Sequence, residues 1–189
     1  MADSIITKRA LAAALQELME EVPFEKINVA HICEKCNMNR KSFYYHFKDK
    51  YDLVNWIFDT EFIALSKVGI SESQPGERWE FIEQTCNYFY ENRSFYCKAL
   101  KIKGQNSFSE HLREYCFPLL KLRLEHLIGS DVADEFTVSF FADAVIGSME
   151  RWLLDKECMP PGQFVSKIKL IVQGGATAIY QEMNDPKGK

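Results

Sequence analysis

The sequence predicts an all-α protein of about nine helices. Apolar residues recur at intervals of three and four along most of the chain, which is the period of a helix with one buried face. No alternating stretch longer than four residues indicates a strand, and glycine and proline are sparse, with the clearest break at residues 71–76. Apolar residues make up 47% of the 189 residues and aromatic residues 13%, which excludes a disordered protein. This length suits one domain, or a small module followed by a larger one.

The first helix is expected to end near Pro23 and to bury a single stripe, which contains Ile6, Ala10, Ala13 or Ala14, and Leu18. Similar stripes predict later helices, one with Trp79, Ile82, Cys86 and Phe89, and one with Phe136, Phe140, Ala144 and Gly147. Pro118 lies within a helical stretch from Phe108 to Leu127 and should kink or split it, because proline lacks an amide donor.

Two short helices with asparagine caps are predicted after the first helix. Asn28 can cap a helix from Val29 to about Lys35, and Asn39 can cap another from Arg40 to about Phe47, because an asparagine side chain accepts a hydrogen bond from a first-turn amide. Asn37 can turn the chain between them, since asparagine tolerates the left-handed conformation. Two short helices joined by so short a turn predict a helix-turn-helix.

The second short helix is expected to have two faces. Phe43 and Phe47 point inward, and the outward face consists of Arg40, Lys41, Ser42, Tyr44 and Tyr45. This outward face suits nucleic acid, because arginine and lysine reach guanine edges or phosphates and hydroxyl groups bind phosphate oxygens. Lys48 and Lys50 stand at the start of the next helix, where a lysine and free helix amides can hold a phosphate together. A solvated helical pair with a few lysines is the alternative.

The charge distribution supports this location. The chain carries 23 basic and 27 acidic residues, a net charge of −4. Six of the basic and two of the acidic residues lie between Lys26 and Lys50, a local charge of +4, which leaves 17 basic and 25 acidic residues, or −8, elsewhere. The whole chain is therefore not generally basic, and only this block favours an anionic partner. The acidic remainder is expected to discourage non-specific adhesion to DNA.

Residues Thr7 to Phe58 resemble the TetR family of bacterial transcriptional regulators. The similarity lies in the run Asn28-Val-Ala-His-Ile-Cys-Glu-Lys-Cys-Asn-Met-Asn-Arg-Lys-Ser-Phe-Tyr-Tyr-His-Phe-Lys-Asp-Lys-Tyr-Asp-Leu53, which includes the Tyr-x-His-Phe and Lys-x-x-Leu patterns. The sequence departs from the family pattern where Asn28 replaces threonine, Cys33 and Cys36 replace small alanines, and Asn37 replaces the turn glycine. All are physically compatible substitutions.

The resemblance implies that residues 39–46 enter the major groove and that Lys50, Tyr45 and His46 grip the DNA backbone. It also implies a DNA-binding domain over residues 1–50 and a helical effector-sensing and dimerisation domain over residues 51–189. The expected DNA-binding residues are Asn28, Asn39, Arg40, Lys41, Ser42, Tyr44, Tyr45, His46, Lys48 and Lys50.

The second half resembles, more loosely, the branch of this family that contains regulators of dihydroxyacetone-kinase operons. The similar features are Asn92-Arg-Ser-Phe-Tyr, the spacing from Gly147 to Trp152, and Pro160-Pro161. This resemblance implies that the signal can arrive through a kinase-like co-regulator protein, with the regulator acting as an activator.

The helices beyond residue 70 are rich in aromatic residues, which either fill a core or line a cavity for a small-molecule effector. The candidate pocket residues are Tyr96, Phe108, His111, Tyr115, Phe141 and Trp152.

A small-residue patch in the last helix predicts a homodimer. Gly174 and Gly175 are adjacent, and a glycine within a helix costs about 1 kcal/mol relative to alanine, so the pair needs a reason such as close approach of another helix. A bend within the monomer is the alternative. The expected dimer residues are Ala144, Gly147, Ile168, Ile171, Gly175 and Ile179.

The remaining motifs favour no catalytic or metal site. Cys33-x-x-Cys36 with His31 and His46 invites a zinc or thiol-sensor interpretation, but the helix-turn-helix register places both cysteines in packing. No glycine-rich phosphate loop or hydrolase motif is present, so neither an enzyme nor a cofactor is expected. The polar start and the lack of an apolar run of roughly 18 residues predict a cytoplasmic protein with no membrane association. The expected partners are double-stranded operator DNA, a second copy of the chain, and a small-molecule effector or a co-regulator protein.

Overall fold

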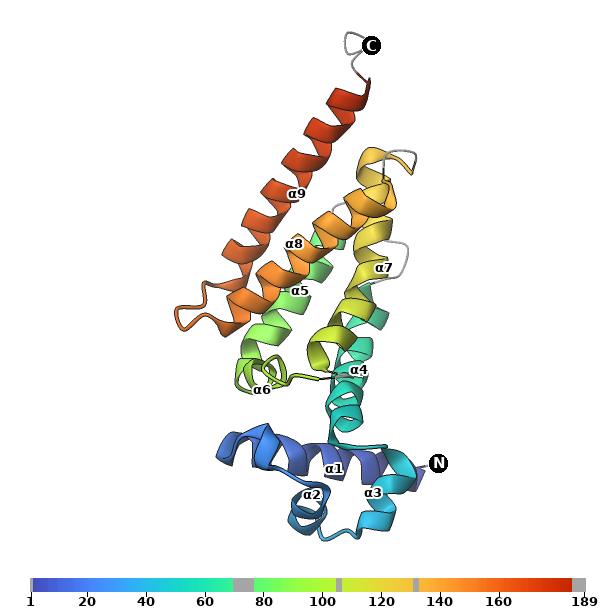
Figure 1. Cartoon of the computed structure of the whole chain (residues 1–189), viewed down its shortest axis with the longest axis vertical. Helices are drawn as coiled ribbons and strands as arrows, with labels where there is room; N and C mark the ends of the chain where they lie inside the picture. Colours follow the sequence, from blue (N-terminus) through green and yellow to red (C-terminus); the bar gives the residue numbers. More distant parts are fainter. Residues whose placement is uncertain (1, 70–76, 105–106, 131–132, 185–189) are drawn as a thin grey trace. The chain divides into compact units, whose positions relative to one another are not determined.

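The computed structural model describes residues 2–69, 77–104, 107–130 and 133–184 and is mostly helical (Figure 1). The fold class predicted from the sequence is confirmed: the described residues form nine α-helices and one short 3-10 helix, and no strand occurs among them. The elements are α1 (Ala2–Glu21), η1 (Phe24–Lys26), α2 (Val29–Lys35), α3 (Arg40–His46), α4 (Lys50–Gly69), α5 (Glu77–Glu91), α6 (Arg93–Ala99), α7 (Phe108–Ile128), α8 (Glu135–Leu154) and α9 (Pro161–Asn184).

The chain packs as two compact units. The first comprises Met1–Glu72 and Glu91–His111, and the second comprises Ser73–Tyr90 and Leu112–Lys189. The functional division expected after residue 50 falls at the first residue of α4, a helix that packs on α1 inside the first unit. That division stays a prediction.

The first unit is built on α1, whose buried residues include Leu11, Leu15 and Met19 at intervals of four. The stripe predicted for this helix was wrong in its position: Ile6 is 64% exposed, Ala10 and Leu18 are only half-buried, and Ala14 is the one predicted member that is buried. The core is completed by apolar residues of the following helices: Ile32, Cys33, Phe43, Phe47, Leu53, Val54, Ile57 and Phe58.

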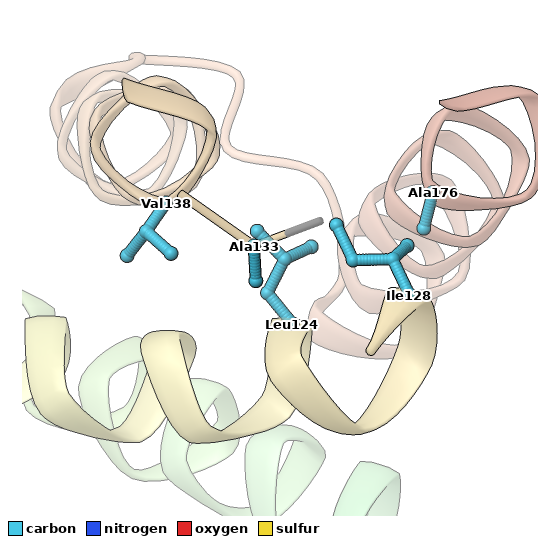
Figure 2. Close-up of a cluster of buried hydrophobic side chains, with 5 residues drawn as sticks. All are labelled: Leu124, Ile128, Ala133, Val138 and Ala176. Carbon is cyan, nitrogen blue, oxygen red and sulfur yellow. The ribbon is translucent and has the colours of Figure 1, made fainter. Parts of the chain in front are cut away.

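The second unit has a core between α7, α8 and α9. Figure 2 shows its buried members, which are Leu124, Ile128, Ala133, Val138 and Ala176. Asp134 caps α8 by accepting a hydrogen bond from the Thr137 amide at 2.8 Å. The α7 helix runs through Pro118 without a break, so the split that the proline suggested does not occur. Among the described residues, no helix is both long and apolar enough to cross a bilayer.

Candidate nucleic-acid interface

The cap of α2 is a reciprocal pair. The Asn28 side chain accepts a hydrogen bond from the His31 amide at 3.0 Å, and His31 Nδ1 accepts one from the Asn28 amide at 3.4 Å. This capping box satisfies two amides that a helix start leaves without partners. The predicted asparagine cap is confirmed, and the participation of His31 was not foreseen.

The turn after α2 is made by Asn37, which has a φ of 54°. The Met38 amide donates to the Cys33 carbonyl oxygen at 2.8 Å, which closes the helix end. The left-handed turn predicted at Asn37 is therefore confirmed, and asparagine meets this conformation at lower cost than most residues.

The α3 helix is capped by Asn39, whose Oδ1 accepts hydrogen bonds from the Ser42 amide at 2.8 Å and the Ser42 hydroxyl at 3.2 Å. Phe43 and Phe47 are 0% and 3% exposed, and the Phe47 ring lies 5.7 Å from that of Trp56 on α4. This short helix is thus fixed at its start by a cap and along one side by two buried rings.

The opposite face of α3 is open. Tyr44 is 58% exposed and Tyr45 is 82% exposed, and Arg40 and Lys41 are exposed beside them. His46 is half-buried, and its ring centre lies 4.9 Å from that of Tyr45, with the two rings nearly perpendicular. The predicted division into an aromatic inner face and a basic, hydroxyl-bearing outer face is confirmed.

The start of α4 differs from the expectation that its free amides help to hold a phosphate. Asp49 Oδ1 accepts hydrogen bonds from the amides of Tyr51 and Asp52 at 2.8 and 2.9 Å. Since these amides already have a carboxylate partner, they are not free for phosphate, and that part of the prediction is corrected. Lys48 remains exposed.

Lys50 points into the first unit. Its ammonium donates to the carbonyl oxygens of Phe24 and Ile27, both at 2.7 Å, and lies 4.2 Å from the centre of the Phe24 ring. Desolvation by burial lowers the pKa of this ammonium. Whether Lys50 also contacts DNA stays a prediction.

A further lysine, which no sequence pattern indicated, lies near α3. The Lys8 ammonium of α1 lies 5.5 Å from the Phe47 ring centre and 5.7 Å from that of Trp56. It therefore places a positive charge beside the end of α3. Only the packing of α1 on α3 brings these positions together, so no local spacing could have found Lys8.

Three of the six predicted pocket residues come together in the first unit. The ring centres of Tyr96 and Phe108 are 5.3 Å apart, and Phe58 lies 5.4 Å from Phe108 and 5.8 Å from His111. His111 Nε2 is 2.7 Å from Asp59 Oδ1, so this aromatic cluster contains one pair of polar side chains.

The other three belong to the second unit. Trp152 stacks on Phe164 at 4.5 Å and donates from Nε1 to the Met159 carbonyl oxygen at 2.8 Å. Phe141 packs beside Gly175, and Tyr115 is half-buried. An effector pocket formed by all six residues stays a prediction.

The predicted dimer residues are unevenly exposed. Ile171 is 66% exposed and Ala144 is exposed, whereas Gly147, Ile168, Gly175 and Ile179 are half-buried. A Cβ atom on Gly175 would lie 3.1 Å from Phe141 Cζ of the same chain. Any side chain at 175 would therefore require the Phe141 ring to move by a few tenths of an ångström. The glycine favours close packing within the protomer, so a partner helix is not required to explain it.

All six cysteines are free thiols. Burial raises the pKa of Cys33 and of Cys36, and it raises those of Cys86 and Cys116 to about 12. Within the described part of the chain, no group of three histidine, cysteine or acidic side chains could hold a metal ion.

Two family models match this chain. The model described as "Bacterial regulatory proteins, tetR family" matches residues 10–57, and the model described as "Transcriptional regulator C-terminal region" matches residues 77–174. The first match contains the whole helix-turn-helix, and the second covers more than half of the chain.

Known relatives agree with these matches. The HTH-type dhaKLM operon transcriptional activator DhaS of Lactococcus lactis is 30% identical over 103 residues, which are 54% of this chain and 53% of that protein. The match thus spans about half the length of that relative.

Solved structures extend the likeness over most of the chain. The dihydroxyacetone kinase operon activator DhaS has a TM-score of 0.60 at 20% identity, over 92% of this chain and 98% of that one. Native NalD, the secondary repressor of the MexAB-OprM multidrug efflux pump in Pseudomonas aeruginosa, has a TM-score of 0.67 at 16% identity, over 92% and 96%. At such identities these structures show a shared fold alone.

Proposed function

Because this chain belongs to the TetR family of bacterial regulatory proteins, we propose that it is a homodimer that reads operator DNA with α3 and whose operator affinity is modulated through its C-terminal domain. The protein is a DNA-binding transcriptional regulator of this family. The observation that carries the proposal is the open face of α3, where Arg40, Lys41, Tyr44 and Tyr45 are exposed together.

The residues of this face have different proposed roles. Arg40 and Lys41 lie in the first turn of α3, and the N-terminal residues of a recognition helix contact base edges. Ser42, Tyr44, Tyr45 and His46 suit sugar and phosphate contacts, which fix the register of the helix on the duplex. The other residues proposed to contact the DNA backbone are Asn28, Asn39 and Lys48. Lys8 joins them because its ammonium lies beside the end of α3.

The proposed dimer forms through α8 and α9. Phe136 and Phe140 on α8 are 78% and 61% exposed, and Leu170 and Ile171 on α9 are 74% and 66% exposed. Exposed apolar side chains in such number mark an interaction surface. A Cβ atom on Gly174 would meet nothing within 4 Å, which leaves room for a partner helix at that position. Two-fold symmetry would then place two α3 helices about 34–36 Å apart, one turn of B-DNA, or a multiple of it.

The charge distribution suits this arrangement. The block from Lys26 to Lys50 carries +4 and the rest of the chain −8. Attraction to phosphates is therefore confined to the helix-turn-helix of each protomer, while the acidic rest of the chain repels DNA.

The signal has two candidate sources. One source is a small molecule bound among the predicted pocket residues. The rings of Tyr96 and Phe108 would supply apolar contacts, and the His111–Asp59 pair would supply polar groups. Alternatively, a co-regulator protein docks on the C-terminal domain and the protein activates transcription. The likeness to DhaS, a transcriptional activator, favours activation of transcription. Titration of purified protein on DNA with candidate small molecules separates the two, since a partner-dependent regulator responds to none of them.

A zinc or thiol sensor at Cys33 and Cys36 is the least supported alternative. Their raised pKa values disfavour the thiolate, which is the form that binds metal and reacts. Bound zinc in purified protein, together with a change in DNA affinity under chelator, would establish this role.

The experiment for the proposed function is selection of bound fragments from a random DNA library by purified protein. The proposal predicts a two-fold symmetric sequence with half-sites about 10–10.5 base pairs apart, centre to centre, or a multiple of that. Recovery of no enriched sequence by a folded, dimeric protein would contradict it. A matched selection with the double variant Arg40→Ala/Lys41→Ala should recover no preference at the base pairs that these residues read.

A further inference from the structure

A cavity of about 270 Å³ lies between the end of α1 and the corner where α5 meets α6. Its lining begins with Gln16 and Met19 on α1 and ends with Lys98 on α6. In Figure 1, α6 lies beside α1, and the two helices are in contact. None of the described residues that line this cavity is one of the six predicted pocket residues. It is therefore separate from the proposed effector pocket.

The cavity combines an apolar floor with a polar rim. The Met19 side chain is 1% exposed and the Phe95 ring is half-buried, while Gln16 and Ser94 place an amide and a hydroxyl group around them. Small-molecule sites have this composition, apolar walls with a few polar groups that fix orientation. Since drug-sized ligands occupy roughly 300–1,000 Å³, this cavity suits a smaller molecule.

The charged groups around the cavity leave an excess of negative charge. Its lining contains two carboxylates, those of Glu20 and Glu91, and one ammonium, that of Lys98, which gives a net charge of −1. Both carboxylates are exposed. Two helices also end here, α1 at Glu21 and α5 at Glu91, and the carboxyl end of a helix carries a partial negative charge. The cavity therefore favours a cation.

Lys98 shows that an ammonium group binds at this end of α1. It donates hydrogen bonds to the carbonyl oxygens of Met19 and, at 3.3 Å, Glu20. These oxygens accept because the last four carbonyl groups of a helix have no partner within it. A metal ion is not the expected occupant, since no group of three acidic, histidine or cysteine side chains in the described part of the chain could hold one. An organic ammonium, which has only a few donors to satisfy, fits better.

We propose that this cavity binds a small organic cation, an amine that also carries a hydroxyl group. Glu20 and Glu91 bind its ammonium, the Gln16 amide and the Ser94 hydroxyl bind its hydroxyl group, and the Phe95 ring contacts its carbon atoms. This binding does not depend on the proposed reading of DNA, because neither DNA nor a second copy of the chain contributes to the site.

The experiment is a titration of the full chain, labelled with nitrogen-15, with three probes of nearly equal size. At neutral pH ethanolamine is a cation, ethylene glycol is neutral and glycolate is an anion. We expect millimolar ethanolamine to shift the amide signals of residues 16–20 and 91–98 in a saturable way, whereas the other two probes shift them far less. Equal responses to all three probes, or no saturable response to ethanolamine at these residues, would overturn the proposal.

Two isosteric variants test the carboxylates. Glu20→Gln and Glu91→Gln should each weaken ethanolamine binding about two- to fivefold, the range for exposed ion pairs, and added salt should weaken it in the wild type. Neither change is expected to alter folding, since both positions are exposed and surface substitutions have small effects on stability. The exposed Glu114 on α7 supplies the matched control, and Glu114→Gln should bind as the wild type does. Wild-type affinity in both cavity variants would overturn the proposal.

Lys98→Met distinguishes a cation site from an anion site. It removes the positive charge that competes for the same acceptors, so ethanolamine should bind about two- to fivefold more tightly. If the cavity takes anions instead, this variant would lose glycolate binding and gain none for ethanolamine, which would overturn the assignment. Circular dichroism checks that the variant is folded, and the two glutamine variants keep the test decisive if it is not.

Discussion

The first prediction concerns Asn39, which caps α3, and tests whether this cap stabilises the helix that is proposed to read DNA. Asn39→Ala removes the acceptor that binds the Ser42 amide at 2.8 Å. Replacing a capping asparagine by alanine costs about 1 kcal/mol, within a range of roughly 0.5–2. The α3 helix has seven residues, fewer than the roughly 12–15 that an isolated helix needs, so it depends on this cap and on the burial of Phe43 and Phe47.

We expect the free energy of unfolding of Asn39→Ala to fall by about 1 kcal/mol. The first turn also carries Arg40 and Lys41, and a dimer presents two such turns. If both turns fray in the free variant, operator binding loses about 2 kcal/mol, about thirtyfold in affinity. Urea unfolding followed by circular dichroism gives the first quantity, and fluorescence anisotropy with the selected DNA gives the second.

Asn39→Ser is the matched control, because serine is an equally good cap. It should retain the stability of the wild type. Equal stability of Asn39→Ala and Asn39→Ser would refute the assignment of the cap. A full loss of affinity in Asn39→Ser with wild-type stability would show that Asn39 acts through direct DNA contact.

Three further predictions concern the dimer, the phosphate contacts and the effect of pH. Ile171→Asp should yield monomers by light scattering without loss of helicity, because two uncompensated carboxylates would be buried at the interface; an unchanged dimer would exclude this residue from it. Lys48→Ala should weaken binding to all DNA sequences and lower the salt slope by about one unit, and an unchanged slope would remove Lys48 from the phosphate contacts. The hydrogen bond from the Thr137 amide lowers the pKa of Asp134 below its ordinary 3.8. Its stabilisation is therefore present above pH 3.8 and is lost as the pH falls through the lower folded value. The stability advantage of the wild type over Asp134→Asn in urea should disappear in acid, and an advantage independent of pH would contradict this.

Local interactions explain why much of the interface could be predicted from the sequence. Asn28 and Asn39 bind amides three residues ahead, and Asn37 turns the chain by its own backbone conformation. The two faces of α3 follow from helical period alone. No contact between distant parts of the chain enters these inferences, so propensity and spacing were sufficient.

Contacts between distant residues could not be predicted in this way. Lys50 binds carbonyls 23 and 26 residues away, and Lys98 binds carbonyls 78 and 79 residues away. The residues around each lysine in the sequence do not distinguish it from an ordinary exposed lysine. Likewise, Asp49 competes with phosphate for the first amides of α4, and Ile6 is exposed because Leu11, Leu15 and Met19 already form the buried side of α1.

In the proposed function, the outward face of α3 reads the operator. The most direct measurement is the ratio of affinities for the selected DNA and a scrambled fragment of the same length, in wild type and in Lys41→Ala, at one salt concentration. We expect Lys41→Ala to lower this ratio by about one to two orders of magnitude, the value of one base contact, while affinity for the scrambled fragment changes far less. An equal loss on both fragments, with the ratio intact, would contradict it.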